Sequence, residues 1–210
     1  MGITTTDLAT ALETFADRIR DAREELTALD SAIGDADHGI NMDRGMTAVR
    51  EHLPALREGQ AGALFKQVGR TLISTVGGAS GPLYGTFFLR LGTALGDADE
   101  VAPGDLARGV RAGLEGIIAL GKASPGDKTM VDAMTPAVEA LEAGADADLG
   151  AALSAAASAA AAGRDSITPL VARKGRASYL GERSAGHQDP GATSATILYE
   201  SLRDGLGNPG

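Results

Sequence analysis

Four aspartates lie within one short stretch of the sequence, LDSAIGDADHGINMDRG at 29–45, which contains a single arginine and no lysine. Two like charges about 4 Å apart repel by roughly 4 kcal/mol at an effective dielectric of 20, so a bare cluster of this kind opposes folding. Carboxylate oxygens are the ligands that hard divalent cations prefer in proteins. The stretch therefore predicts a metal site.

The metal ligands that we predict are Asp30, Asp35 and Asp37. On a regular helix neighbouring members of this set would point about 140° and about 160° apart, so they cannot converge from a helix. Gly34 and Gly39 bracket the acidic residues and permit the turns of a folded-back loop after the first helix. The alternative is that these aspartates are ordinary helix caps and solvated turn residues.

The spacing argues against calcium and for magnesium. An EF-hand loop also begins D-x-D-x-G, but it needs a bidentate Glu at its twelfth position. Counting from Asp35 that position is Met46, and counting from Asp30 it is Asn41. Mg²⁺ takes few protein carboxylates and completes its shell with waters and substrate phosphates. A substrate that carries phosphate is therefore expected.

The glycine-rich stretch STVGGASGPLYG at 74–85 could complement such a metal. Gly77, Gly78 and Gly81 allow backbone N–H groups to face outward, and Ser80 adds a hydroxyl. The helix that follows presents its positive N-terminus, which favours anions. The alternative is that these glycines serve only close helix packing.

A second stretch, GKASPGDKT at 121–129, imitates a phosphate-binding P-loop. It inserts an aspartate between the glycine and the lysine, and it follows a predicted helix instead of a strand, so we reject that assignment. Gly121, Thr129 and Met130 could instead form a pocket for an adenine edge, with Met130 as an adaptable apolar wall or as part of the core.

Basic residues gather near the end of this acidic chain, in ARKGRASYLGERSAGHQDPGATS at 172–194. The run reaches Asp189-Pro190-Gly191, an N-cap followed by a favoured first-turn proline, so it meets the start of the last helix at a defined place. A guanidinium there could contact a phosphate or a partner, although such runs are often solvated surface. His38, inside the acidic loop, is expected to contact the ligand.

Helices must position these segments, since apolar residues recur in steps of three and four. The first stripe predicts one continuous helix through Leu8, Leu12, Phe15, Ile19, Ala22, Leu26 and Leu29. Further stripes lie in 42–53, 64–72, 84–95, 106–117, 130–141, 149–170 and 196–206. We predict an all-α fold with no strand, an antiparallel up-and-down bundle or barrel of eight helices in one domain, 1–210. The chemically interesting connections would then meet at one end.

Composition excludes several functions. The formal net charge of −9 argues against nucleic-acid binding, which depends on basic surface. No apolar run approaches membrane-spanning length, and without cysteine there is no disulfide or thiolate metal site. We expect a cytoplasmic protein without a membrane partner.

Four segments taken together, GDADHGINMDRG, GGASGPLYGTFF, GKASPGDKTM and GRASYLGERSAGHQDPGATS, resemble the nucleotide-binding L subunit of dihydroxyacetone kinases over nearly the whole chain. The resemblance implies an eight-helix barrel with the nucleotide at one end, and two Mg²⁺ ions held by the three aspartates named above. It also implies nucleotide contacts, from the phosphates to the base, by His38, Asn41, Ala79, Ser80, Gly121, Met130, Arg176, Asp189 and Gly191.

The same resemblance implies a phosphotransferase that passes a phosphoryl group from the nucleotide to dihydroxyacetone held on a separate K subunit. A stand-alone L subunit is expected to keep ADP bound and to have it recharged in place by a phosphohistidine-carrying M subunit of a phosphoenolpyruvate-dependent phosphotransferase system. The alternatives are direct use of ATP, another keto-sugar acceptor, or an ADP-sensing adaptor without catalysis. A fatty-acid kinase would need further domains.

Overall fold

The computed structural model describes residues 2–207, and within them most of the chain is helical. The helices are α1 (Thr5–Asp21), α2 (Arg23–Ile33), α3 (His38–Leu56), α4 (Ala61–Thr75), α5 (Ser80–Leu95), α6 (Pro103–Gly121), α7 (Met130–Gly144), α8 (Leu149–Ser166), the 3-10 helix η1 (Arg176–Ser184) and α9 (Pro190–Leu206). The prediction of an all-α fold is confirmed.

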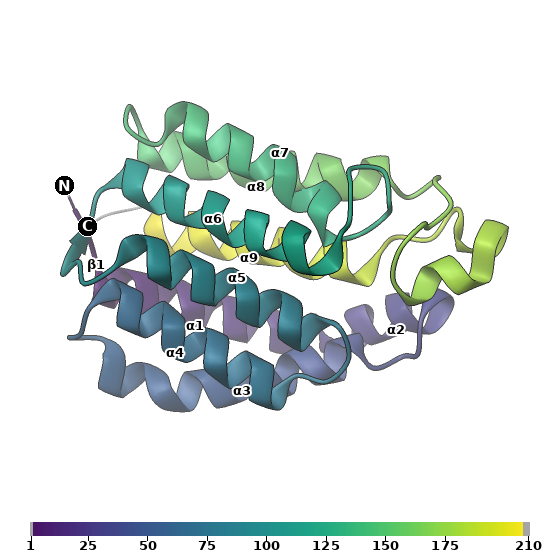
Figure 1. Cartoon of the computed structure of the whole chain (residues 1–210), viewed down its shortest axis with the longest axis horizontal. Helices are drawn as coiled ribbons and strands as arrows, with labels where there is room; N and C mark the ends of the chain where they lie inside the picture. Colours follow the sequence, from purple (N-terminus) through teal and green to yellow (C-terminus); the bar gives the residue numbers. More distant parts are fainter. Residues whose placement is uncertain (1, 208–210) are drawn as a thin grey trace.

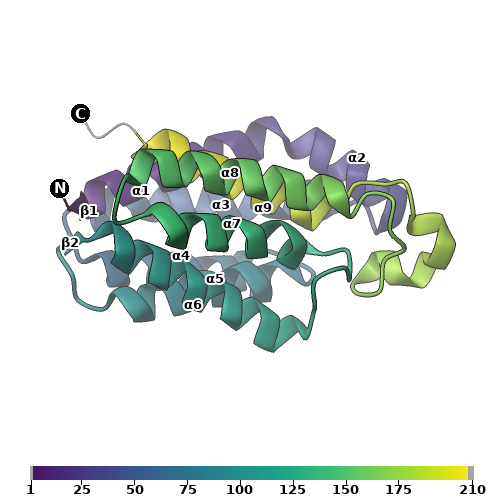
Figure 2. The ribbon, with the colours of Figure 1, turned by 90° about the horizontal axis from the view of Figure 1, so that it is seen from above.

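Eight of these helices form a closed ring (Figures 1 and 2). Each helix packs against the next in the order α1, α3, α4, α5, α6, α7, α8 and α9, and α9 returns to α1. Neighbours in the ring run in opposite directions, which gives an up-and-down barrel (Figure 1). Helix α2 lies outside the ring at one end, against α3, α9 and η1. This arrangement is the predicted eight-helix barrel.

The first helix differs from the prediction. The apolar stripe expected to form one helix is divided at Ala22, where the backbone leaves the helical region (φ −87°, ψ 2°). The N–H of Ala22 still donates to the carbonyl of Arg18 at 2.9 Å, so the stripe stays nearly in phase across the break. The division lets α2 leave the barrel and carry Asp30 to the end of the molecule.

The barrel interior is apolar, and one cluster of buried side chains runs through all eight ring helices. The alanine tract of α8 is helix, as predicted: Ala152, Ala156 and Ala160 are buried and allow α8 to pack closely on α7 and α9. Glycine permits the same closeness elsewhere, since a Cβ at Gly69 would lie 2.7 Å from the carbonyl oxygen of Gly85 on α5.

Two short strands that the sequence analysis missed lie at the end of the barrel opposite α2 (Figure 1). Strand β1 (Ile3–Thr4) pairs antiparallel with β2 (Glu100–Val101) and ties the start of the chain to the α5–α6 connection. Thr4 also begins α1 through a capping box with Asp7. Within residues 2–207, none of the helices combines the length and the apolar character that crossing a membrane requires.

Candidate functional site

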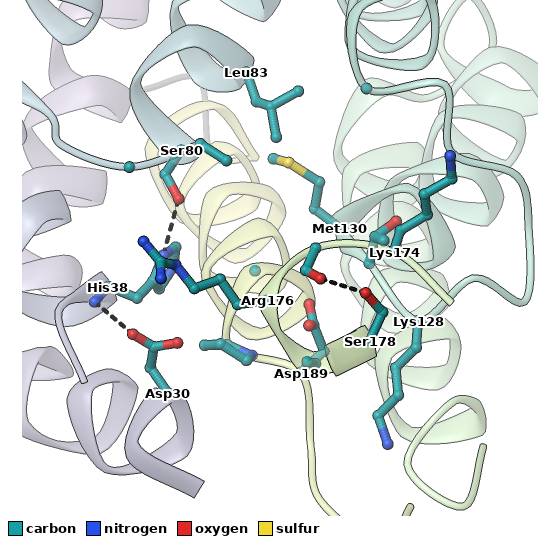
Figure 3. A pocket seen from close by; sticks show the side chains of 18 of the residues that line it. Asp30, His38, Ser80, Leu83, Lys128, Met130, Lys174, Arg176, Ser178 and Asp189 are labelled. Carbon is teal, nitrogen blue, oxygen red and sulfur yellow. Dashed lines mark hydrogen bonds between the residues drawn. The ribbon is translucent and has the colours of Figure 1, made fainter. Parts of the chain in front are cut away.

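A cavity of about 820 Å³ opens at the end of the barrel where α2 and η1 lie. The four connections singled out in the sequence, together with the helix ends beside them, line it (Figure 3). Every residue predicted to bind metal or nucleotide lines this cavity except Asn41. The helices form the barrel with its apolar interior, and their ends carry the polar groups of the site.

The acidic triad, which we define as Asp30, Asp35 and Asp37, is brought together as expected, with one carboxylate oxygen of each within 4.8 Å of the others. Asp30 lies in the last turn of α2 and is buried, while Asp35 and Asp37 lie in the loop to α3. One oxygen of Asp30, Oδ2, accepts the backbone N–H groups of Asp37 at 2.8 Å and His38 at 3.1 Å. These bonds hold the loop against α2 and leave Oδ1 of Asp30 available.

The local sequence explains why the loop folds this way. A Cβ at Gly34 would overlap the carboxylate of Asp30, and one at Gly39 would overlap the carbonyl oxygen of Arg23, so the backbone approach needs glycine at both positions. Between them, Ala36 has a positive φ of 61°, which an alanine adopts only at a cost of roughly 1–2 kcal/mol. The loop is therefore held in a conformation that its own local preferences oppose.

The triad fits a magnesium ion better than it fits helix capping. Asp37 occupies the N-cap position of α3, yet its side chain makes no capping hydrogen bond. The donor set is oxygen only, which suits a hard cation. A guanidinium nitrogen of Arg176 lies 2.9 Å from Oδ2 of Asp35 and offsets part of the negative charge. Asp30, Asp35 and Asp37 would hold the ion.

The N-terminus of α5 faces the triad across the cavity (Figure 3). Ala79 is its N-cap and offers no side-chain oxygen, so no side chain among residues 2–207 caps the N–H groups of this first turn. Gly78 has a φ of +65°, which glycine adopts without strain and which turns the chain into the helix. An uncapped helix start beside a hydroxyl, that of Ser80, favours an anion.

His38 is 7% exposed and joins three elements of the site. Its Nδ1 lies 3.0 Å from Oγ of Ser80, and its Nε2 lies 2.9 Å from Oγ of Ser194 on α9. Burial lowers the pKa of His38, although the charges of Asp30 and Asp37 oppose this. A neutral imidazole has a single N–H group, so it can donate to only one of the two hydroxyl groups, that of Ser80 or that of Ser194.

An apolar wall closes the other side of the cavity. The side chain of Met130, the first residue of α7, extends toward Leu83 of α5 (Figure 3). Ile117 and Gly121 of α6 line the same wall. Within residues 2–207, a Cβ at Gly121 would meet only the side chain of Leu83, at 3.4 Å, so the wall is not crowded at this position.

Asp189 lies at the base of the cavity and is the N-cap of α9, as predicted from the Asp-Pro pair. Its Oδ2 accepts the N–H of Ala192 at 2.7 Å. Burial raises the pKa of Asp189 to about 7; the Ala192 hydrogen bond lowers it, Asp132 adds to the rise and Lys128 opposes it. A carboxyl group near half-protonation can either donate or accept a hydrogen bond at neutral pH.

Lys128 does not point into the cavity as a P-loop lysine would (Figure 3). It is 1% exposed, and its Nζ donates to the carbonyl oxygens of Thr168 at 2.8 Å, Leu170 at 2.9 Å and Ser184 at 2.7 Å. The rejection of a P-loop therefore agrees with the structure. The ammonium group instead holds the two ends of one segment, residues 168–186, which we call the cap.

The cap covers the cavity and includes η1, which is interrupted at Gly181. Sequence analysis treated this region as a connection and missed the helix. The cap packs on α2 through a small apolar cluster of its own, formed by Ile33, Ala172 and Ala177 with Leu180 beside them. Arg176, on the cap, faces the acidic triad from above (Figure 3).

Asn41 is not among the residues that line the cavity, but it lies beside Gly77, which is. Its side-chain oxygen accepts from Arg44 at 2.7 Å, and a Cβ at Gly77 would lie 3.1 Å from its amide. Asn41 therefore supports the glycine-rich loop. Sequence reasoning gave no role to Ser194 or to Tyr84, whose hydroxyl groups lie behind His38. The signal that could have shown them is the group of hydroxyl residues Thr193, Ser194 and Thr196, all buried, in the first half of α9.

Comparison with known proteins gives close matches over most of the chain. Residues 32–204 match the DAK2 domain. The chain is 47% identical, over 96% of its length and 97% of the relative's, to the ADP-binding subunit DhaL of the PEP-dependent dihydroxyacetone kinase of Escherichia coli (strain K12). It is 41% identical, over 90% of its length and 91% of the relative's, to the ADP-binding subunit DhaL of the PTS-dependent dihydroxyacetone kinase of Lactococcus lactis subsp. lactis (strain IL1403).

A solved structure shares the fold. The dihydroxyacetone kinase of C. freundii in complex with AMP-PNP and Mg²⁺ superposes with a TM-score of 0.73 at 27% identity over 93% of this chain. The match covers 33% of that kinase, so this chain spans about a third of the solved protein.

Proposed function

The chain belongs to the DAK2 domain family, and from that membership we propose that it is the nucleotide-binding subunit of a dihydroxyacetone kinase. It would transfer a phosphoryl group from a magnesium-bound nucleotide to dihydroxyacetone held on a separate K subunit. The observation that carries the proposal is the acidic triad facing the uncapped start of α5 across one cavity. The names of the two ADP-binding relatives support the same reading.

Within this proposal the acidic triad holds two Mg²⁺ ions. Asp37 is free to do so because its side chain caps nothing, and Asp30 is fixed in place by the N–H groups of Asp37 and His38. A bound magnesium–nucleotide complex supplies the phosphoryl group and the positive charge that neutralises it during transfer. The structure of the C. freundii kinase with AMP-PNP and Mg²⁺ supports both components.

The chain's own groups would position the nucleotide. Ser80 and the first turn of α5, with Ala79, bind phosphate oxygens, and Arg176 meets them from the cap. Gly121 and Met130 receive the base against the apolar wall, which includes Leu83. The cap excludes water from the reacting end, and such positioning provides most of what phosphoryl transfer requires.

At the base of the cavity, Asp189 and Gly191 bind the polar part of the nucleoside, where a buried carboxyl group can satisfy a hydroxyl or an amino group. His38 holds Ser80 in place from behind. Asn41 contributes indirectly, by supporting the loop at Gly77.

We assign the binding of the phosphoryl acceptor to a partner subunit. Among residues 2–207 the large apolar side chains that are more than a third exposed all lie at the cavity end of the barrel: Ile40, Ile73, Ile118, Leu120, Leu170 and Tyr179. Tyr179, on the cap, is 89% exposed. An apolar rim around a reactive site supports docking of another subunit there. We propose that the K subunit and the phosphohistidine-carrying M subunit use this end in turn.

The phosphate donor follows from the relatives. The two ADP-binding relatives described above, each matched over more than nine tenths of its length, are named as PEP-dependent and PTS-dependent, so we propose that ADP stays bound and is recharged in place, in the cytoplasm where phosphoenolpyruvate is available. A second acceptor is also supported: the chain is 39% identical to a D-erythrulose kinase of Mycolicibacterium smegmatis (strain ATCC 700084 / mc(2)155), although it covers only 35% of that protein.

Native mass spectrometry of the purified chain tests the proposal, and we expect retained ADP with two Mg²⁺ ions. Mixing the chain with a K subunit, dihydroxyacetone and a phosphorylated M subunit should then yield dihydroxyacetone phosphate. Product formation from ATP without an M subunit would indicate the direct ATP mechanism. Nucleotide binding without product under either condition would indicate an adaptor, and absence of nucleotide binding would overturn the proposal.

A further inference from the structure

A continuous chain of side-chain hydrogen bonds runs behind the phosphate side of the cavity. Tyr84 of α5 lies 2.8 Å, hydroxyl to hydroxyl, from Ser194 of α9, which lies 2.9 Å from Nε2 of His38. Nδ1 of His38 lies 3.0 Å from the hydroxyl of Ser80. We call these four residues the relay. It begins and ends on α5, because Ser80 and Tyr84 are one helical turn apart.

The inner half of the relay is out of contact with solvent and with the ligand. Tyr84 and Ser194 are fully buried, and neither lines the cavity. The outer half, His38 and Ser80, does line it. Tyr84 and Ser194 can therefore act on a ligand only through hydrogen-bonded neighbours, which are the His38 ring and, for Ser194, also the carbonyl oxygen of Gly191.

The relay protons have two arrangements in which the Tyr84 proton is paired. Within residues 2–207, Ser194 is the sole side-chain partner of the Tyr84 hydroxyl, and either hydroxyl can donate across the 2.8 Å contact; the Tyr84 proton is paired only when Tyr84 donates to Ser194. Ser194 can then donate either to Nε2 of His38 or to the carbonyl oxygen of Gly191 at 3.1 Å. A neutral imidazole then carries its proton on Nδ1 in the first case and on Nε2 in the second.

The choice decides what Ser80 offers to the cavity. If Ser194 donates to Nε2, the proton of His38 is on Nδ1 and points to Ser80, whose own hydroxyl proton is then free. If Ser194 donates to Gly191, His38 carries its proton on Nε2. Ser80 then donates its hydroxyl proton to Nδ1 and has none to offer to the cavity. A phosphate oxygen only accepts hydrogen bonds, so it needs the first arrangement. The donation from Tyr84 favours that arrangement, because hydrogen bonds that run in one direction strengthen one another.

We propose that Tyr84 and Ser194 are positioning residues that hold His38 in the Nδ1–H tautomer and thereby make the Ser80 hydroxyl a donor to the nucleotide phosphate. The proposal rests on the proposed function, since it takes a phosphate-bearing nucleotide as the ligand. It adds two buried residues that no contact with the ligand would reveal. It also explains by function, and not by packing alone, why Ser80 and Tyr84 lie one helical turn apart on α5.

The test uses the nucleotide-free full chain and measures binding of ADP with Mg²⁺, and of adenosine, by isothermal titration calorimetry. The main variant is Tyr84→Phe with Ser194→Ala, which removes both hydroxyls together so that neither is left buried without its partner. We expect ADP affinity to fall roughly tenfold, as for the loss of one hydrogen bond to a charged group, and adenosine affinity to stay unchanged. The matched control is Tyr199→Phe, because Tyr199 is a buried tyrosine whose hydroxyl has no hydrogen-bond partner within residues 2–207.

A cycle with Ser80→Ala makes the test specific. If the relay acts through Ser80, adding Ser80→Ala to the double variant should weaken ADP binding no further than Ser80→Ala alone does. Losses that add, or a double variant within twofold of the wild type, would overturn the relay. A wild-type chain that fails to bind ADP would instead refute the proposed function, so the two failures are distinct.

Nitrogen-15 NMR of the histidine side chains provides a test that requires no variant. In the wild-type chain with ADP and Mg²⁺ we expect the His38 signals of a ring protonated at Nδ1 and unprotonated at Nε2. The opposite tautomer would overturn the proposal even if the double variant failed to fold. The milder Tyr84→Phe variant should shift the signals toward the opposite tautomer.

Discussion

Neutralising Asp37 should stabilise the metal-free protein while it destroys ligand binding. The carboxylate oxygens of the triad lie within 4.8 Å of one another. At that distance each pair repels by about 1 kcal/mol in water and about 3 kcal/mol at an effective dielectric of 20. Asp37→Asn removes two of these pairs and no capping hydrogen bond. Because the loop is partly exposed and Arg176 already offsets the charge of Asp35, we expect the free energy of unfolding to rise by an amount near the value for water, about 2 kcal/mol for the two pairs.

The assay is thermal unfolding in EDTA and again with saturating Mg²⁺ and ADP. For a chain of this size about 2 kcal/mol corresponds to a rise in Tm of roughly 4–8 °C in EDTA. A ligand at a hundred times its Kd adds about 2.7 kcal/mol to the wild type, and the variant should lose most of that increment. The effect of the substitution on Tm thus shrinks or changes sign between the two conditions.

Asp43→Asn is the matched control, since Asp43 lies in the same acidic stretch but on α3, paired with Arg23 at 3.6 Å and outside the triad. It should not raise Tm in EDTA and should keep the full ligand increment. The reasoning fails if Asp37→Asn lowers Tm in EDTA, or if it retains the wild-type gain with Mg²⁺ and ADP.

Three further changes test other parts of the site. Lys128→Met should lower the free energy of unfolding by about 3 kcal/mol, because three carbonyl groups, that of Ser184 buried, lose a charged donor. Denaturant unfolding measures this loss, and a value below about 1 kcal/mol would contradict the role assigned to the ammonium group. Gly34→Ala should displace the carboxylate of Asp30 and abolish Mg²⁺ binding in calorimetry, whereas Gly78→Ala, where nothing lies near the added Cβ, should cost only the strain of its positive φ. Asp189 has a folded pKa of about 7 against 3.8, so the native state binds the extra proton and the wild type should lose stability relative to Asp189→Asn as pH rises through this range; parallel curves of unfolding free energy against pH would contradict the burial argument.

The fold was predictable because its signals are local. Apolar steps of three and four marked the ring helices, and Asp189 with Pro190 marked the start of α9. The break at Ala22 left no such mark, since the apolar stripe stays nearly in phase from α1 into α2 and the division shows only in the packing of α2 on α3, α9 and η1. The short strands were invisible for a similar reason, because two residues carry no periodicity.

The site was predictable where its residues are neighbours in sequence and obscure where they are not. The triad spans eight residues, so glycine and aspartate spacing exposed it. The partners of Lys128 lie 40, 42 and 56 residues away, and Ser194 lies 156 residues from His38 and 110 from Tyr84. No local pattern records such contacts. A lysine in an apparent phosphate loop proved to be a structural cation for the same reason.

The small apolar cluster beneath the cap has a consequence for how long any molecule stays inside the protein. The cap is joined to α2 by Ile33, Ala172, Ala177 and Leu180, a cluster separate from the barrel interior. It can therefore open by local unfolding at a fraction of the global cost, with the ring of helices intact. Residence time in the cavity then depends on this cluster, on the ion pair between Arg176 and Asp35 and on the hydrogen bonds of Lys128 to the ends of the cap, more than on the packing of the barrel interior.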